Sequence, residues 1–496
     1  MLSVEAMLGT GCTVIAPGRS FVRDGLLAEI QAWRALLDGQ GARVVGLLAD
    51  NSPEWIAADL GIRAAGAVCV ALPSFFADAQ LEHVIASAGI DHVLTDTPRR
   101  LLALDSGLQP VAAHGGVDLL ARHVDADPVL HPDTVQVTFT SGSTGRPKGV
   151  CLAAASATRL AEALAGTLAP LGIQRHLSVL PYATLLENVA GTYAALGIGA
   201  AVCAPPLSDV GFASDGAFSP QRFLACLHYW APDSVILLPE LLKALVVMGE
   251  SGAPMPQSLR FIAVGGGKVG AALIKRAQAL GLPVHEGYGL SECGSVVSLN
   301  RPGEIRPGSV GRPLPHVRVR IADDGEIHVA DNAMLGYLGE PRAGAEIATG
   351  DLGEFDEDGF VYVRGRKKNQ FTTSFGRNVN PEWPEALLAQ ASALRQVAVF
   401  GEAMPMNIAV VVPAMTGDMR HDAIARAIDA ANAALPRYAC ISGWLVADAA
   451  FSAVNGMATP NGRLRRDAIW QHYEARIRHK AEAIALSQFN SLSTEV

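Results

Sequence analysis

The stretch Thr138–Val150 reads TFTSGSTGRPKGV and sets Ser and Thr among three glycines, ahead of Arg, Pro and Lys. Such glycines let backbone N–H groups turn toward an anion, and nearby hydroxyls and an ammonium add donors, charge or a magnesium ligand. The spacing departs from GxxxxGK[ST], which argues against an ordinary P-loop kinase or ATPase. We predict a phosphate-binding loop that includes Lys148; a polar surface turn after a strand is the alternative.

A second glycine-rich segment, FIAVGGGKVGAALIKRAQALGLPVHEGYG, contains Gly265-x-Gly267-x-x-Gly270 between an expected strand and an expected helix. This is the arrangement of a dinucleotide-binding loop, and Glu286 falls near the place of its ribose acid. An NAD-linked oxidoreductase is therefore one hypothesis. The floor of a ligand pocket is the other, because no downstream acid–base pair suggests hydride chemistry.

The third segment is EGYGLSE, from Glu286 to Glu292. Tyr288 offers a flat apolar face for a base, and the glycines beside it permit close backbone approach. Glu292 is a carboxylate suited to Mg²⁺. A helix start with Ser291 as N-cap and Glu292 in the first turn is a second interpretation, compatible with the first.

Bulk properties narrow the class of protein. At 496 residues the chain is too long for one core, so two or more domains are expected. A net charge of −9 argues against a nucleic-acid partner. Seven scattered cysteines without a CxxC pair are typical of reduced thiols. The first residues carry no basic region like that of a signal peptide. Both observations favour a cytoplasmic protein. The uncharged stretch Val189–Ser208 has the length of a membrane span, but its glycines and its two prolines favour a buried strand and turn.

The pattern along the chain predicts an α/β fold. Residues 43–100 alternate β-rich runs with helical spacing, which predicts βαβ units in a parallel sheet, and the pattern resumes over 176–297. Residues 308–364 carry short strands and Asp-Gly turns typical of antiparallel hairpins. A compact α+β segment follows a boundary near Lys367–Asn369. It includes three strands, a helix over about 418–435, a helix after Arg466, and a tail over 481–496 that ends in a disordered SQFNSLSTEV.

Taken in order, these segments resemble the adenylate-forming superfamily of acyl-CoA synthetases, adenylation domains and luciferases. TFTSGSTGRPKGV is similar to its phosphate loop, EGYGLSE to its adenine and magnesium segment, and ATGDLGEFDEDGFVYVRGRKKNQ to its ribose-binding and hinge region. GRNVNPEWPEALL is similar to its crossing loop, and TPNGRLRRDAI to its last active-site loop. The resemblance implies a large N-terminal domain of layered α/β sheets (1–367), with a β-rich subdomain at about 305–365, and a small mobile α+β domain (368–480).

The resemblance also implies residue roles. Asp351 would accept hydrogen bonds from the ribose diol, and Arg366 would lie near the ribose or the phosphates. Lys368 would lie at the hinge between the large and the small domain, and Gly376 would lie at the tip of the crossing loop. Thr144 and Glu292 would bind the metal, and Tyr182, Thr184, Gly289 and Leu290 the acid. The implied nucleotide-binding residues are Thr140, Ser141, Gly142, Ser143, Thr144, Gly145, Gly265, Gly266, Gly267, Glu286, Gly287, Tyr288, Gly289, Ser291, Asp351 and Arg366.

The implied reaction needs ATP, Mg²⁺ and a thiol. A carboxylic acid becomes an acyl-adenylate, and the thiol of coenzyme A or of a phosphopantetheine then displaces AMP. LPYATLLENVAGTY, GRKKNQFTTSFGRNVNP and NGMATP resemble the long-chain acyl-CoA synthetase branch, which implies a fatty or other hydrophobic acid. The alternative acid is an aryl or amino acid, and the alternative acceptors are an acyl carrier protein and an amine.

Four positions depart from the family's pattern. Arg463 aligns with the lysine that holds the carboxylate and the α-phosphate, and it replaces a compact ammonium by a planar fork. Thr184 stands where an aromatic or His gate residue is usual, Ala154 replaces a frequent His, and Ser291 replaces Thr. A non-catalytic descendant that binds nucleotide is therefore a further hypothesis.

Overall fold

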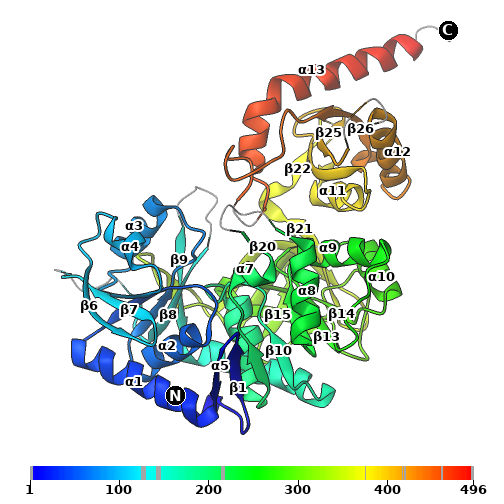
Figure 1. Ribbon diagram of the computed structural model, residues 1–496. Coiled ribbons are helices and arrows are strands. Elements are labelled where there is room, and N and C mark those ends of the chain that lie inside the picture. Colours follow the sequence, from blue (N-terminus) through cyan, green and yellow to red (C-terminus); the bar gives the residue numbers. More distant parts are fainter. Residues whose placement is uncertain are drawn as a thin grey trace.

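The computed structural model describes residues 4–124, 130–140, 147–213, 218–267, 269–374, 376–415, 417, 420–459 and 462–492, with side chains described as far as residue 484. Within these residues the chain forms two large sheets, one of nine strands and one of eight, and smaller sheets of four, three and two strands. Figure 1 shows the two large sheets side by side in the N-terminal part, with the small C-terminal domain above one of them. This is the α/β arrangement of a large and a small domain that the sequence predicts.

The eight-stranded sheet confirms the alternation predicted for residues 43–100. Its parallel strands and their connecting helices are β3 (Val44–Leu48), α2 (Pro53–Ala64), β4 (Val68–Ala71), α3 (Asp78–Ser87) and β5 (His92–Thr95). The start of α2 follows from local sequence, because the Ser52 side chain accepts a hydrogen bond from the Trp55 N–H and Pro53 takes the first helical position.

A hairpin in the same sheet carries the expected phosphate loop. β8 (Thr134–Thr140) pairs antiparallel with β9 (Lys148–Ala153), and Thr140 lies opposite Lys148 at the open end of the pair. The two ends of the loop are therefore held beside each other. Ser141, Gly142, Ser143, Thr144 and Gly145 lie outside the described residues.

The nine-stranded sheet contains the second predicted α/β region. Its central parallel strands are β10 (Arg175–Leu177), β11 (Ala201–Cys203), β12 (Ser234–Leu237), β13 (Phe261–Val264) and β14 (Val284–Leu290). The helices of this region are α5 (Ala154–Leu168), the π-helical segment η3 (Leu186–Tyr193), α8 (Pro220–Trp230), α9 (Pro239–Glu250) and α10 (Ala271–Ala279). β15 (Ser295–Leu299) then turns back antiparallel to β14, and this hairpin fixes EGYGL at the carboxyl end of the sheet.

The hairpin-rich region is antiparallel as predicted. β17 (Arg318–Ile321), β18 (Glu326–Ala330), β20 (Glu346–Phe355) and β21 (Val361–Arg366) pair in that order. Asp351 on β20 lies directly opposite Arg366 on β21. β19 (Gly336–Tyr337) lies outside this sheet and pairs with β9, the strand that follows the predicted phosphate loop.

The small domain has its own core around three strands. β24 (Leu394–Phe400) pairs antiparallel with β25 (Asn407–Pro413), which pairs parallel with β26 (Ile441–Val446). The helices α11 (Glu382–Leu388), α12 (Arg420–Asn432) and α13 (Arg466–Leu492) complete it. α12 lies within the range predicted for that helix.

α13 extends into the segment predicted to be a disordered tail, of which residues 493–496 lie outside the described residues. α13 continues to Leu492 and leads away from the rest of the small domain (Figure 1). The segment after Arg466 contains neither Gly nor Pro up to that point, so nothing in it stops a helix that has begun. Across the described part of the chain, no helix is both long and apolar enough to cross a membrane.

Candidate active site

The glycine loop after β13 and the EGYGL segment of β14 lie side by side. Val264 is the register partner of Glu286, so the residues that follow each of them share one end of the sheet. A Cβ at Gly265 would lie 3.3 Å from the Gly287 carbonyl oxygen, and a Cβ at Gly266, where φ is +76°, would lie 2.9 Å from Leu238 Cδ2. The two segments therefore pack closely at Gly265, and a side chain at Gly266 would meet Leu238, so glycine suits both positions.

Gly289 is required by the fold itself. A Cβ there would lie 1.6 Å from the Ser295 carbonyl oxygen, so the β14–β15 hairpin could not close with any other residue. Leu290 ends the strand opposite Ser295 and is half-buried. Ser291 is the first residue of a three-residue 3₁₀ turn and makes no capping hydrogen bond, so the interpretation of Ser291 as a helix N-cap is wrong.

Asp351, Arg366 and Tyr288 form a charged cluster beside this surface. Asp351 Oδ1 lies 2.9 Å from Arg366 Nε, and its Oδ2 accepts a hydrogen bond of 2.7 Å from the Tyr288 hydroxyl. Burial raises the pKa of Asp351, and the Arg366 guanidinium and the Tyr288 hydroxyl oppose that shift. Because each carboxylate oxygen can accept two hydrogen bonds, Asp351 keeps acceptor capacity for a diol.

Arg463 of the small domain interacts electrostatically with the same cluster. Desolvation and the nearby Arg366 lower its pKa, while Glu382, Asp351 and Glu292 raise it, so its guanidinium lies within the field of all four groups. A tight turn presents it: the Arg463 N–H donates to Thr459 Oγ1 over 3.0 Å.

The turn that carries Arg463 is held in place by Arg466, three residues further along the chain. Arg466 Nη1 donates to Glu385 Oε1 over 2.6 Å, which ties the start of α13 to α11. Of the residues that the sequence analysis assigned to one site, Asp351 and Arg366 form an ion pair, and Arg463 of the small domain lies within the electrostatic influence of both.

Lys148 and Glu292 are joined through a residue that the sequence analysis missed. Lys148 Nζ lies 4.8 Å from the centre of the Tyr337 ring, and the Tyr337 hydroxyl donates to Glu292 Oε1 over 2.8 Å. Glu340 also pairs with Lys148, at 2.9 Å, in an exposed contact. The pairing of β9 with β19 places Tyr337 beside Lys148 and Glu292, and no local sequence motif predicts that pairing.

The residue set around Glu292 fits a magnesium ion delivered with a nucleotide. Among the described residues, no group of three or more His, Cys, Asp or Glu side chains could hold a metal by itself. Mg²⁺ is usually bound by one or two carboxylates together with the phosphate oxygens of a substrate, so a single oriented carboxylate is sufficient. Glu292, held by Tyr337, is such a group.

Replacing Tyr337 by Phe tests this arrangement. The variant keeps the ring under Lys148 but leaves Glu292 without its orienting hydrogen bond, so we expect the Mg²⁺ concentration for half-maximal activity to rise about tenfold. Magnesium titrations of the wild-type protein and the variant measure the change. Tyr362→Phe is the matched control, because Tyr362 also donates to a carboxylate, that of Asp356, at 3.3 Å; an equal shift in both variants would contradict the assignment.

Two predicted acid-binding residues, Tyr182 and Thr184, have side chains that make contacts within the protein. Tyr182 is 1% exposed, its ring packs against Trp55 and its hydroxyl donates to Ser178 over 3.0 Å, so a direct contact between its side chain and a substrate is not supported. Thr184 is half-buried and donates to the Pro181 carbonyl oxygen over 2.8 Å, which uses its hydroxyl in a local turn.

The hinge and crossing-loop candidates lie between the domains and at a hairpin turn. Lys368 follows Lys367, whose ammonium pairs with Asp324 at 2.6 Å and with Glu326 at 2.7 Å on the large-domain side. Gly376, with φ at +70°, sits between the strands of a two-stranded hairpin with open space where a Cβ would be. Neither position is shown to move, and both roles stay predictions.

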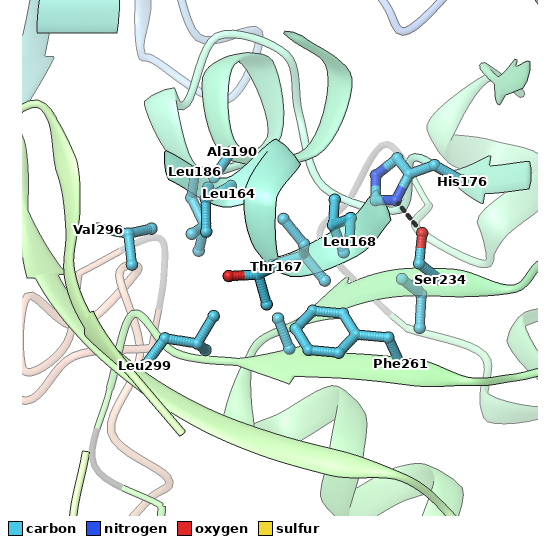
Figure 2. A pocket seen from close by; sticks show the side chains of 13 residues that line it. Leu164, Thr167, Leu168, His176, Leu186, Ala190, Ser234, Phe261, Val296 and Leu299 are labelled. Atoms are coloured by element: carbon cyan, nitrogen blue, oxygen red, sulfur yellow. Dashed lines mark hydrogen bonds between the residues drawn. The ribbon is translucent and has the colours of Figure 1, made fainter. Parts of the chain in front are cut away.

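An apolar pocket opens beneath the glycine loop. The lining residues come from α5, β10, η3, β12, β13 and β15 (Figure 2): Leu164, Thr167, Leu168, His176, Leu186, Ala190, Ser234, Val235, Ile236, Phe261, Ala263, Val296 and Leu299. Its volume is about 40 Å³. No sequence motif marks these positions, because each strand and helix contributes only one to three of them.

The chain belongs to the AMP-binding enzyme family. The family's sequence profile matches residues 32–338, and that of the AMP-binding enzyme C-terminal domain matches residues 368–483. The family is adenylate-forming, and the matched region includes Gly265–Gly270, so the hypothesis of an NAD-linked oxidoreductase is wrong.

Proteins with similar sequences or structures include ligases that use different acyl acceptors. The chain is 26% identical to the long-chain-fatty-acid–CoA ligase FadD15 of Mycobacterium bovis over 88% of this chain and 87% of the relative. It is 28% identical to the fatty acid–[acyl-carrier-protein] ligase MmaC of Mycobacterium marinum over 76% and 78% of the two chains. Among solved structures, an anthranilate CoA ligase, AuaEII, in complex with anthranoyl-AMP matches with a TM-score of 0.78 at 19% identity, over 95% and 96% of the two chains.

Proposed function

We propose that the protein activates a hydrophobic carboxylic acid with ATP and then transfers the acyl group to a thiol. The observation that carries the proposal is the cluster of Asp351, Arg366 and Tyr288, reached by Arg463 from the other domain. A buried carboxylate with spare acceptor capacity suits a ribose, and the guanidinium groups suit phosphate oxygens and a substrate carboxylate. The proposed site is thus completed only when the small domain contributes Arg463.

In the first half-reaction, an oxygen of the acid's carboxylate bonds to the α-phosphorus of ATP. The bond from that phosphorus to the bridging oxygen breaks, and pyrophosphate departs. Arg463 neutralises charge on the acid and on the α-phosphate as they approach, and Lys148 lies at the mouth of the predicted phosphate loop. Magnesium, when bound at Glu292, would neutralise phosphate charge.

In the second half-reaction, a thiol sulfur bonds to the acyl carbon and AMP departs, while the thiol proton passes to solvent. Coenzyme A is the acceptor we favour, since the sequence segments around Leu180–Tyr193 and Lys367–Pro381 resemble acyl-CoA synthetases. Likeness to FadD15 supports the same acceptor.

A carrier protein is the second candidate acceptor. Likeness to MmaC, named as a ligase that uses an acyl carrier protein, favours it. An amine acceptor and a non-catalytic descendant, which the Arg463 substitution would permit, are alternatives to thioester formation altogether.

Product analysis separates these functions. The purified protein is incubated with ATP, Mg²⁺, a panel of acids and, in turn, coenzyme A, a phosphopantetheinylated carrier protein and an amine; products are identified by mass spectrometry. We expect acyl-CoA and stoichiometric AMP. An acylated carrier protein or an amide without acyl-CoA would overturn the preferred acceptor, and bound ATP with no product would favour the non-catalytic descendant.

A further inference from the structure

The apolar pocket adjoins the proposed adenylation site. Ala263 lies two residues before Gly265, and Val296 is the register partner of Gly289. Leu186 links the two regions, because a Cβ at Gly266 would lie 3.9 Å from Leu186 Cδ2. An acid whose carboxylate faces Arg463 would therefore have this pocket open to its hydrocarbon part.

The wall of the pocket is almost wholly apolar, and its buried polar groups are satisfied internally. His176 Nδ1 is 3.0 Å from Ser234 Oγ, a contact seen in Figure 2, and His176 Nε2 is 3.0 Å from Glu187 Oε1. Glu187 in turn accepts hydrogen bonds from the N–H groups of Val179 and Leu180. A polar group at the far end of a substrate would find His176 already committed at both ring nitrogens.

The far end of the pocket is sealed. Leu168, His176, Ser234 and Phe261 are each at most 5% exposed, so a chain cannot pass between them to solvent. Phe261, which has the largest apolar side chain in the wall, is held in place by its ring stacking on His285 with centroids 4.6 Å apart.

We propose that Phe261, backed by the His176–Glu187–Ser234 cluster, limits the substrate to compact apolar acids: short or branched alkyl chains or a single ring, and not long unbranched chains. This inference rests on the proposed function, since it assumes that the pocket receives the acid. Phe261 acts as a specificity-determining residue, and the cluster behind it acts as a positioning group.

Two measurements on the full chain test the inference. The first is kcat/KM for ATP–pyrophosphate exchange with isovalerate, phenylacetate, hexanoate, decanoate and palmitate. The second is calorimetric binding of the same acids, which does not depend on turnover. Both are made on the wild-type protein and on Phe261→Ala and Phe261→Leu, the latter because removal of a whole ring can prevent folding.

Phe223→Ala is the matched control. Phe223 is also a buried phenylalanine of the large core, but it lies on α8 and does not line the pocket. We expect wild-type protein to prefer the compact acids to palmitate by about a hundredfold or more, since a single excess methylene in a closed pocket costs about tenfold or more. Both Phe261 variants should raise relative use of decanoate by at least about tenfold, and the control should not.

Wild-type use of palmitate equal to that of hexanoate, or Phe261 variants with an unchanged acid profile, would overturn the inference while leaving the proposed function standing. Absence of exchange with every acid would instead overturn the proposed function. In that case, binding of compact acids over palmitate, shifted in Phe261→Leu, would still support the pocket's selectivity, and equal or absent binding of all acids would overturn it.

Discussion

Asp351→Asn is expected to lower acid-dependent adenylation by at least about a hundredfold, the scale of losing a key charged group in a preorganised site. The carboxylate pairs with Arg366 at 2.9 Å and accepts the Tyr288 hydroxyl at 2.7 Å. An amide keeps the shape but loses the charge that holds Arg366, and it offers a ribose diol one acceptor oxygen in place of two. Nucleotide binding by calorimetry and pyrophosphate exchange measure the two losses.

Asp356→Asn is the control for this variant. Asp356 pairs with Arg306 at 3.1 Å in the turn after the same strand, away from Tyr288 and Arg463. Its replacement should leave nucleotide binding within about twofold, as is usual for exposed ion pairs. Thermal unfolding of both variants shows whether the protein still folds; a folded Asp351→Asn protein that binds ATP and adenylates normally would remove Asp351 from the site.

Arg463→Ala is expected to lower adenylation by about 10²–10³-fold while slowing thioester formation from a supplied acyl-adenylate only a few-fold. The reason is that the proposed task of Arg463 is charge neutralisation during the first half-reaction. Rapid-quench measurements of each half-reaction separate the two. Arg478→Ala, which removes an exposed arginine of α13 paired with Glu474 at 2.9 Å, is the control and should affect neither step.

The Arg463→Lys variant tests whether arginine at this position supports adenylation better than lysine does. The charges of Glu382, Asp351, Glu292 and Arg366 all act on its guanidinium, and we propose that a planar fork serves several such groups better than a single ammonium. We therefore expect the lysine variant to adenylate no faster than wild type. A rise of about tenfold, worth about 1.4 kcal/mol of barrier, would show instead that the natural arginine impairs the step.

Local patterns predicted most of the fold. The alternation over residues 43–100 and the Asp-Gly turns of 308–364 encode pairing between neighbours in sequence, and both sheets formed as expected. The tail was predicted from its polar composition, and α13 continues into it because the segment contains no helix breaker before Leu492.

The site was harder to predict where long-range pairing builds it. Asp351 and Arg366 stand in recognisable motifs, so they could be named in advance. Tyr337 reaches Glu292 only through the β9–β19 pairing, and Phe261 becomes a pocket wall only when β13 and α5 meet. Tyr182 lies in a motif that resembles a substrate-binding segment, but the motif did not predict that its ring is buried against Trp55, and its role in binding the acid stays a prediction.

The most direct test of the account is ATP–pyrophosphate exchange by the purified wild-type protein, with and without a hydrophobic acid. Acid-dependent exchange that disappears in both Asp351→Asn and Arg463→Ala is the predicted result, because residues of both domains would then be needed for one adenylation site. Measurable ATP binding with no exchange for any acid, or exchange that survives both substitutions, would contradict it.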